Sequence, residues 1–166
     1  ARAPGLLRPA GRQMTHLGEA AVQRRVRDRI ASLQPSSRAR WGKMNAGQML
    51  CHLTDSFLLP LGEKEVALIP MSPPQRAVMK FGALYVPLRW PRDLQSTPEV
   101  TQGLGGTPPE EFEADRTRLI RTVERFCDPR NGLEGRQHPF FASLTRIQWL
   151  RWGYLHADHH LRQFGA

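Results

Sequence analysis

The sequence has few cysteines, few lysines and no long apolar run. Its two cysteines, Cys51 and Cys127, form neither a C-x-x-C pair nor a dense framework. This argues against a disulfide scaffold and a zinc finger, and it favours a reducing, cytoplasmic setting. No stretch approaches the roughly 20 apolar residues of a membrane-spanning helix, because Arg, Gly or Pro interrupts each candidate. We therefore do not expect an integral membrane protein.

The positive charge is concentrated at the N-terminus. The chain of 166 residues has 24 Lys plus Arg against 15 Asp plus Glu, and nine of the arginines lie within residues 1–40. Residues 1–15 contain no acidic residue and several Pro and Gly, so we predict a flexible basic arm ahead of one domain, residues 16–166. An organelle signal or a nucleic-acid contact is a weaker interpretation of this arm. No recognition motif accompanies the charge, so nucleic-acid binding ranks last.

Apolar residues recur at helical spacing in four long segments, and no segment alternates as a strand does. The predicted long helices span residues 16–33, 45–59, 108–127 and 145–164. A shorter helix is predicted over 74–86, inside a proline-rich connection of nearly fifty residues. We therefore expect an all-α fold, a four-helix bundle with a long connection between helices 2 and 3 that lets these two run parallel.

Three of these helices have predicted start signals. Asn45 is placed to cap the second helix. Thr107 with Glu110, and Thr145 with Gln148, have the spacing of capping boxes at the starts of the third and fourth.

Three histidines are expected to face the interior. His156 and His160 are one helical turn apart, on the face that also carries Trp149 and Trp152. His52 lies among the apolar residues of the second helix. A lone buried histidine is usually a hydrogen-bonded core residue, but three inward imidazoles can share one cation. We predict a divalent metal site with an open fourth position, suited to Zn, Ni, Fe or Mn.

Other residues near the predicted ligands are weaker candidates. Ala157 stands where a His-Glu-x-x-His metalloprotease has its general base, so a protease is not expected. His159 lies on the helix flank and is interpreted as facing solvent or, less favoured, as supporting the ligands. The two tryptophans are expected mainly in the core, and Gln48 and Gln163 are candidates for orienting ligands or substrate. Capping or loop roles are the simplest expectation for His138.

Two segments resemble an uncharacterised branch of the DinB-like superfamily. The first runs from Trp41 through Asn45 and Met49 to His52, and the second joins His138-Pro139-Phe140-Phe141 to the segment from His156 to Phe164. Most of residues 16–165 is covered. The resemblance implies a four-helix bundle whose metal is bound by one histidine of helix 2 and two of helix 4, which corresponds to His52, His156 and His160.

The resemblance leaves the chemistry open. Better understood relatives are thiol-dependent enzymes, so it implies a metal-dependent transferase or hydrolase of a small molecule, with a low-molecular-weight thiol as a second cofactor. The alternative is a non-catalytic metal-binding or stress-associated binding module. The sequence does not decide whether the protein is an enzyme or whether it forms a homodimer.

Overall fold

The part of the chain that the structure describes is mostly helical, with five α-helices and one very small sheet. The computed structural model describes residues 14–92 and 94–166. Its elements are α1 (Ala20–Ala31), α2 (Ala46–Leu61), α3 (Pro73–Tyr85), the 3-10 turn η1 (Pro98–Val100), α4 (Phe112–Cys127), β1 (Gln137–His138), β2 (Ala142–Ser143) and α5 (Arg146–Gln163). Most of the predicted basic arm, residues 1–13, lies outside the described residues.

The helices begin largely where the sequence predicts. At α2, the Asn45 side chain accepts from the Gln48 N–H and the Gln48 side chain accepts from the Asn45 N–H. Thr145 and Gln148 form the same reciprocal capping box at α5. Each box pairs two backbone donors that would otherwise have no partner at a helix start.

The predicted capping box at Thr107 is wrong. The Thr107 N–H and hydroxyl both donate to the carboxylate of Asp55 on α2, at 2.7 Å each. Because this buried carboxylate takes the Thr107 N–H from which Glu110 would accept in a capping box, the box does not form there, and α4 begins five residues later. Its cap is Glu111, whose side chain accepts from the N–H groups of Glu113 and Ala114.

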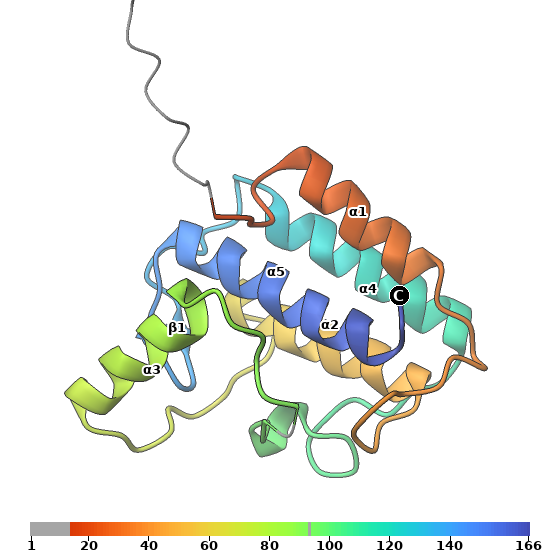
Figure 1. Ribbon diagram of the computed structural model, residues 1–166, viewed down its shortest axis with the longest axis horizontal. Helices are drawn as coiled ribbons and strands as arrows, with labels where there is room; N and C mark the ends of the chain where they lie inside the picture. The colour runs from red at the N-terminus through yellow and green to blue at the C-terminus, as the bar shows by residue number, and fades with distance from the viewer. Residues whose placement is uncertain (1–13, 93) are drawn as a thin grey trace, which may run out of the picture.

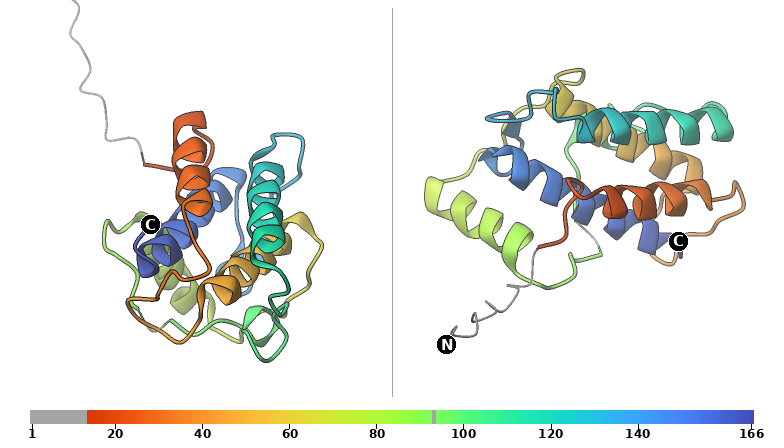
Figure 2. Two further views of the ribbon diagram at one scale, coloured as in Figure 1. Left: turned by 90° about the vertical axis from the view of Figure 1, so that its right-hand side faces the viewer. Right: turned by 90° about the horizontal axis from the view of Figure 1, so that it is seen from above.

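Four helices pack side by side in a closed arrangement (Figure 1). Helix α1 contacts α4 and α5, while α2 contacts the same two helices. The colours in Figure 1 show that α2 and α4 run in one direction and α1 and α5 in the other, as the long connection allows. The left view of Figure 2 shows the four helices nearly end-on, and the right view shows α3 beside α5, outside this group.

The core lies between these four helices. At Gly153 of α5 the neighbouring side chains of α2 and α4 come unusually close to the backbone. A Cβ atom on Gly153 of α5 would lie 2.8 Å from a ring carbon of Phe126 and 2.9 Å from one of Phe57. The rings of Phe57 and Phe126 pack edge to face, with centroids 4.9 Å apart. Gly153 therefore lets α5 approach α2 and α4.

The small sheet was not predicted. Strands β1 and β2 pair antiparallel, with Gln137 opposite Ser143 and His138 opposite Ala142. Two residues per strand are too short for an alternating pattern to be visible in the sequence.

No helix among the described residues is long and apolar enough to cross a membrane.

Candidate metal centre

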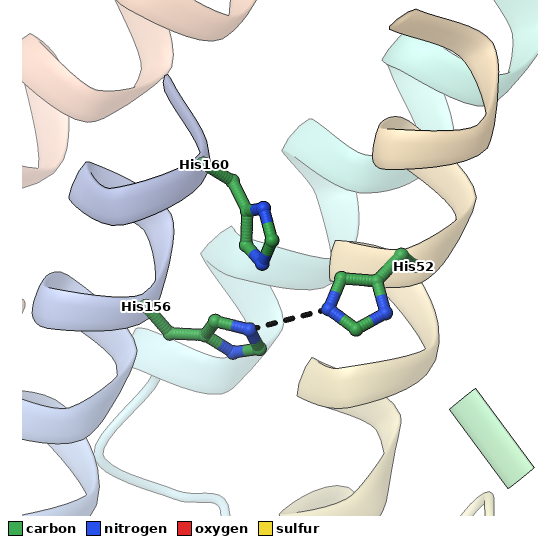
Figure 3. A group of neighbouring side chains, drawn as sticks. All are labelled: His52, His156 and His160. Atoms are coloured by element: carbon green, nitrogen blue, oxygen red, sulfur yellow. Dashed lines mark hydrogen bonds between the residues drawn. The ribbon is translucent and has the colours of Figure 1, made fainter. Parts of the chain in front are cut away.

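Helices α2 and α5 bring three histidines together in the interior. His52 comes from α2, and His156 and His160 from successive turns of α5. Figure 3 shows the three rings turned toward one another across the space between the helices. Each ring offers a nitrogen, and these three nitrogens all lie within 4.8 Å of one another. We call these residues the histidine triad; they lie close enough to hold a metal ion.

A backbone carbonyl sets the tautomer of His52. Its Nδ1 lies 2.8 Å from the carbonyl oxygen of Val100, in η1. A carbonyl oxygen only accepts, so Nδ1 carries the proton and Nε2 keeps its lone pair. The ring is 3% exposed and is held with Nε2 toward α5.

A side-chain amide sets the tautomer of His160 in the same way. The Gln163 Nε2 donates to the carbonyl oxygen of Trp41 at 2.7 Å, which identifies the other amide atom as oxygen. That oxygen, Oε1, lies 2.8 Å from His160 Nδ1 and therefore accepts its proton. His160 Nε2 is left with a free lone pair. Metal-binding histidines commonly have such an acceptor on the second ring nitrogen.

His156 completes the group with one nitrogen paired and one not. Its Nε2 lies 3.3 Å from Nε2 of His52. Two imidazole nitrogens bound to one tetrahedral zinc ion are also about 3.3 Å apart, given bonds of about 2.0–2.1 Å. If the two nitrogens instead form a hydrogen bond, the proton must sit on His156 Nε2, and its buried Nδ1 then has no donor to accept from. A shared cation removes the need for that proton.

Desolvation lowers the pKa of all three imidazoles and favours their neutral forms, although His156 is partly exposed. Desolvation lowers the pKa of His52 below its ordinary value, despite the Val100 hydrogen bond. It lowers the pKa of His156 and His160 further, and the neighbouring rings add to the effect. The neutral imidazole is the form that binds a metal.

Two tryptophans pack against His156 of the triad. The Trp152 ring centroid lies 4.9 Å from that of His156. Trp90, from the segment after α3, lies 6.0 Å from His156 and is held by its indole N–H, which donates to the Ala83 carbonyl. The fully buried Trp149 packs against Trp152 one layer further from the triad.

Of the two glutamine candidates, only Gln163 contacts a histidine of the triad. Gln163 contacts His160 directly, as described above. Gln48 does not reach the histidines, because its Oε1 is taken up by the cap of α2.

The solvent-facing interpretation of His159 is wrong. Its side chain is 5% exposed, and its ring lies 5.9 Å from Trp41 and 5.1 Å from His160. The flank of α5 is covered by segments outside the predicted helices, those that carry Trp41 and Trp90. Helical periodicity alone does not show such cover.

The loop role predicted for His138 is confirmed in part, because its Nδ1 accepts from the Phe140 N–H, but the side chain is also buried. Its ring stacks on Phe141 with centroids 4.3 Å apart and contacts Trp149 and Trp152. Burial lowers the pKa of His138 to about 3. The sequence signal for this position was its place beside an aromatic pair.

The cysteines contribute no reactive thiol. Cys51 adjoins His52 in sequence, but burial and the nearby Asp115 carboxylate raise its pKa to about 12. Burial does the same for Cys127. Both are buried free thiols that stay protonated at neutral pH.

Fold and site define a helical protein with a cluster of three histidines, two buried and one partly exposed, close enough to bind a metal. The chain belongs to the family described as "protein of unknown function (DUF1569)", whose model matches residues 13–166. No curated protein and no solved structure matches it.

Proposed function

We propose that the protein is a metal-dependent enzyme that holds one divalent cation through the Nε2 atoms of the histidine triad. The observation that carries the proposal is the 3.3 Å separation of His52 Nε2 and His156 Nε2. The Val100 carbonyl and Gln163 support it, because each fixes a ligand with its lone pair free.

The number of ligands favours catalysis over a purely structural site. Among the described residues, no fourth His, Cys, Asp or Glu joins the triad. Structural zinc sites are closed by four protein ligands, whereas catalytic sites keep a position open. Zinc, nickel, iron and manganese all suit three imidazoles. Such a cation, when bound, supplies Lewis acidity that activates water or a thiol.

The surrounding residues restrict the reaction class. Trp90 and Trp152 both pack against His156 and give the site apolar surroundings. Ala157 cannot serve as a general base, so a proton must move to the substrate or to a group outside this segment. We therefore propose a small-molecule reaction, thiol transfer or hydrolysis, with a low-molecular-weight thiol as the second cofactor in the first case.

The arrangement of the helices supports a wider relationship. The closed contacts among α1, α2, α4 and α5 are those expected of a four-helix bundle. We propose that the bundle is of the DinB-like type and that the protein works in the cytoplasm.

The second candidate is a non-catalytic metal-binding module. It is favoured by the burial of His52 and His160, because a cation there would tie α2 to α5.

Metal content tests the first part of the proposal. The chain is purified without a histidine tag, and bound metals are measured before and after incubation with zinc, nickel and manganese. We expect close to one equivalent in the wild type and its loss in His156→Ala and His160→Ala. His16→Ala and His159→Ala should retain the metal. Less than about a tenth of an equivalent in the wild type under every condition would contradict the proposal.

Turnover separates the two candidates. The metal-loaded protein is tested with small electrophiles plus glutathione and related thiols, and with ester and amide substrates. Turnover that disappears in His156→Ala supports an enzyme. Full metal occupancy without turnover of either panel would favour the binding module.

A further inference from the structure

Buried polar atoms without hydrogen-bond partners gather beside the triad. Among the described residues, seven buried side-chain polar atoms have no partner, and three of them lie in or beside the triad: Trp41 Nε1, His156 Nδ1 and His159 Nδ1. Buried polar groups are nearly always paired, so a group of unpaired ones indicates a partner that comes from outside the chain. His156 lies within the triad, whereas Trp41 and His159 adjoin it.

The rings of Trp41 and His159 pack together beside the triad, and the Trp90 ring packs against His159. We call these three rings the wall. The Trp41 and His159 rings meet edge to face at 5.9 Å, and Trp90 lies 6.2 Å from His159. The indole N–H of Trp41 is a fixed donor. The His159 side chain is nine-tenths buried, and its Nδ1 can donate when it carries the ring proton.

An arginine adds positive charge at this wall. The Arg92 guanidinium carbon lies 5.0 Å from the centroid of a Trp41 ring. Arg92 is exposed, and among the residues that the structure describes, which do not include the adjacent Asp93, no carboxylate lies within ion-pair distance of it. The nearest acid along α5, Asp158, is already paired with two other arginines, Arg29 and Arg162, at 2.8 Å each.

We propose that Trp41, His159 and Arg92 form a subsite for an anionic group, a carboxylate or a phosphate, of the molecule bound at the triad. This inference rests on the proposed function and names its substrate class. An anion at the edge of the Trp41 ring would accept from the indole N–H, and the exposed Arg92 side chain, whose guanidinium lies over that ring, would turn toward the anion. Charge-assisted hydrogen bonds of this kind are the strongest that side chains form with anions. The rings of the wall are neutral, so by themselves they would favour an uncharged group. The positive charge of Arg92 is the feature that favours an anion.

Titration of the full chain, freed of metal by chelation, tests the subsite. The ¹⁵N-labelled protein receives propionate, methyl phosphate or neutral propionamide up to about 50 mM, the range of weak single-group binding. Trp41→Phe identifies the Trp41 indole signal among the four tryptophans. We expect this signal to shift with saturation for at least one of the two anions and not for propionamide. The anion that saturates at lower concentration identifies the class.

Two arginine variants make the test specific. Arg92→Gln should weaken the apparent affinity for the anion by about two- to fivefold, as expected for loss of one exposed charged partner. Arg89→Gln, a change at an exposed arginine three residues earlier, should leave it unchanged. Equal shifts with propionate and propionamide, no saturation with either anion, or equal weakening in both variants would overturn the proposal. Because the assay uses metal-free protein, failure of the metal proposal would appear separately, in the metal content.

Discussion

His138 makes the folded state sensitive to acid. Its buried ring holds the pKa near 3, compared with an ordinary value of 6.5. Between these pH values the unfolded chain binds a proton that the folded chain does not, so the free energy of unfolding falls as the pH drops below 6.5. Above 6.5 both states are neutral and the effect disappears.

We therefore predict that His138→Phe reduces the acid sensitivity of folding. Between pH 6.5 and 3, the slope of unfolding free energy against pH should decrease by up to about 1.4 kcal/mol per pH unit. At pH 7.5 the variant should be less stable by about 1 kcal/mol, because the Phe140 N–H loses Nδ1 of His138 as its acceptor. Urea unfolding across the pH range measures both effects. Parallel slopes for variant and wild type would show that His138 is not the group responsible.

Gln163 provides a second test, of ligand orientation. Gln163→Ala removes the acceptor from His160 Nδ1 and should lower zinc affinity about 10–100-fold. Gln163→Glu keeps an acceptor for His160 Nδ1 but loses the donor to the Trp41 carbonyl, so it should restore only part of the affinity. Isothermal titration with zinc measures both.

Gln48 is the matched control. Gln48→Ala loses half of the capping box of α2 and should cost up to about 1 kcal/mol of stability. Its zinc affinity should match that of the wild type. A similar loss of affinity in Gln48→Ala and Gln163→Ala would mean that general loosening of the fold, rather than the His160 contact, weakens the site.

Two helical glycines should respond to alanine in opposite ways. A Cβ at Gly82 of α3 meets nothing within 4 Å, so Gly82→Ala should stabilise the protein by about 0.5–1 kcal/mol through helix propensity. A Cβ at Gly153 of α5 would press on Phe126, Phe57 and Leu17. Gly153→Ala should therefore cost about 1–3 kcal/mol. Denaturant unfolding at constant pH gives both values, and a gain at Gly153 would contradict the close approach of α5.

The sequence predicts the helices better than it predicts which distant segments pack against them. Periodicity and local capping identified α2 and α5, because apolar spacing and the boxes at Asn45 and Thr145 depend on neighbours in the chain. The predicted start of α4 is wrong because Asp55, the acceptor that takes the Thr107 N–H, lies 52 residues away in the sequence. Local patterns carry no information about such a contact.

The same distinction holds for the site. Inward faces of two helices were enough to select the histidine triad. The contact of Val100 with His52 and the packing of Trp90 could not be predicted, because the segments that carry these residues have no regular period. The burial of His159 could not be predicted for the same reason, since Trp41 and Trp90 pack against it. A proline-rich connection has many possible paths, and only the packed structure shows where it crosses α5.

At the scale of the whole molecule, a cation in the triad would join two helices. Zinc at about a hundred times its dissociation constant should stabilise the fold by about 2.7 kcal/mol. For a chain of this size the Tm then rises by roughly 5–10 °C. Differential scanning calorimetry measures this rise, and chelation should reverse it. His52→Ala, which leaves ligands on α5 alone, should lose most of the shift, whereas an undiminished shift would place the cation elsewhere.

The triad unites parts of the chain that are far apart, and this sets the order of assembly. His52 is separated from His156 by 104 positions and from Val100 by 48. Closing loops of this length costs entropy that only later contacts recover, so such pairings form late in folding. In the nascent chain only His156 and His160 are near each other, and two imidazoles on an unanchored helix form a poor trap for metal. The cation would thus be acquired by a finished fold, and the supply of metal would govern how long that fold persists rather than how fast it forms.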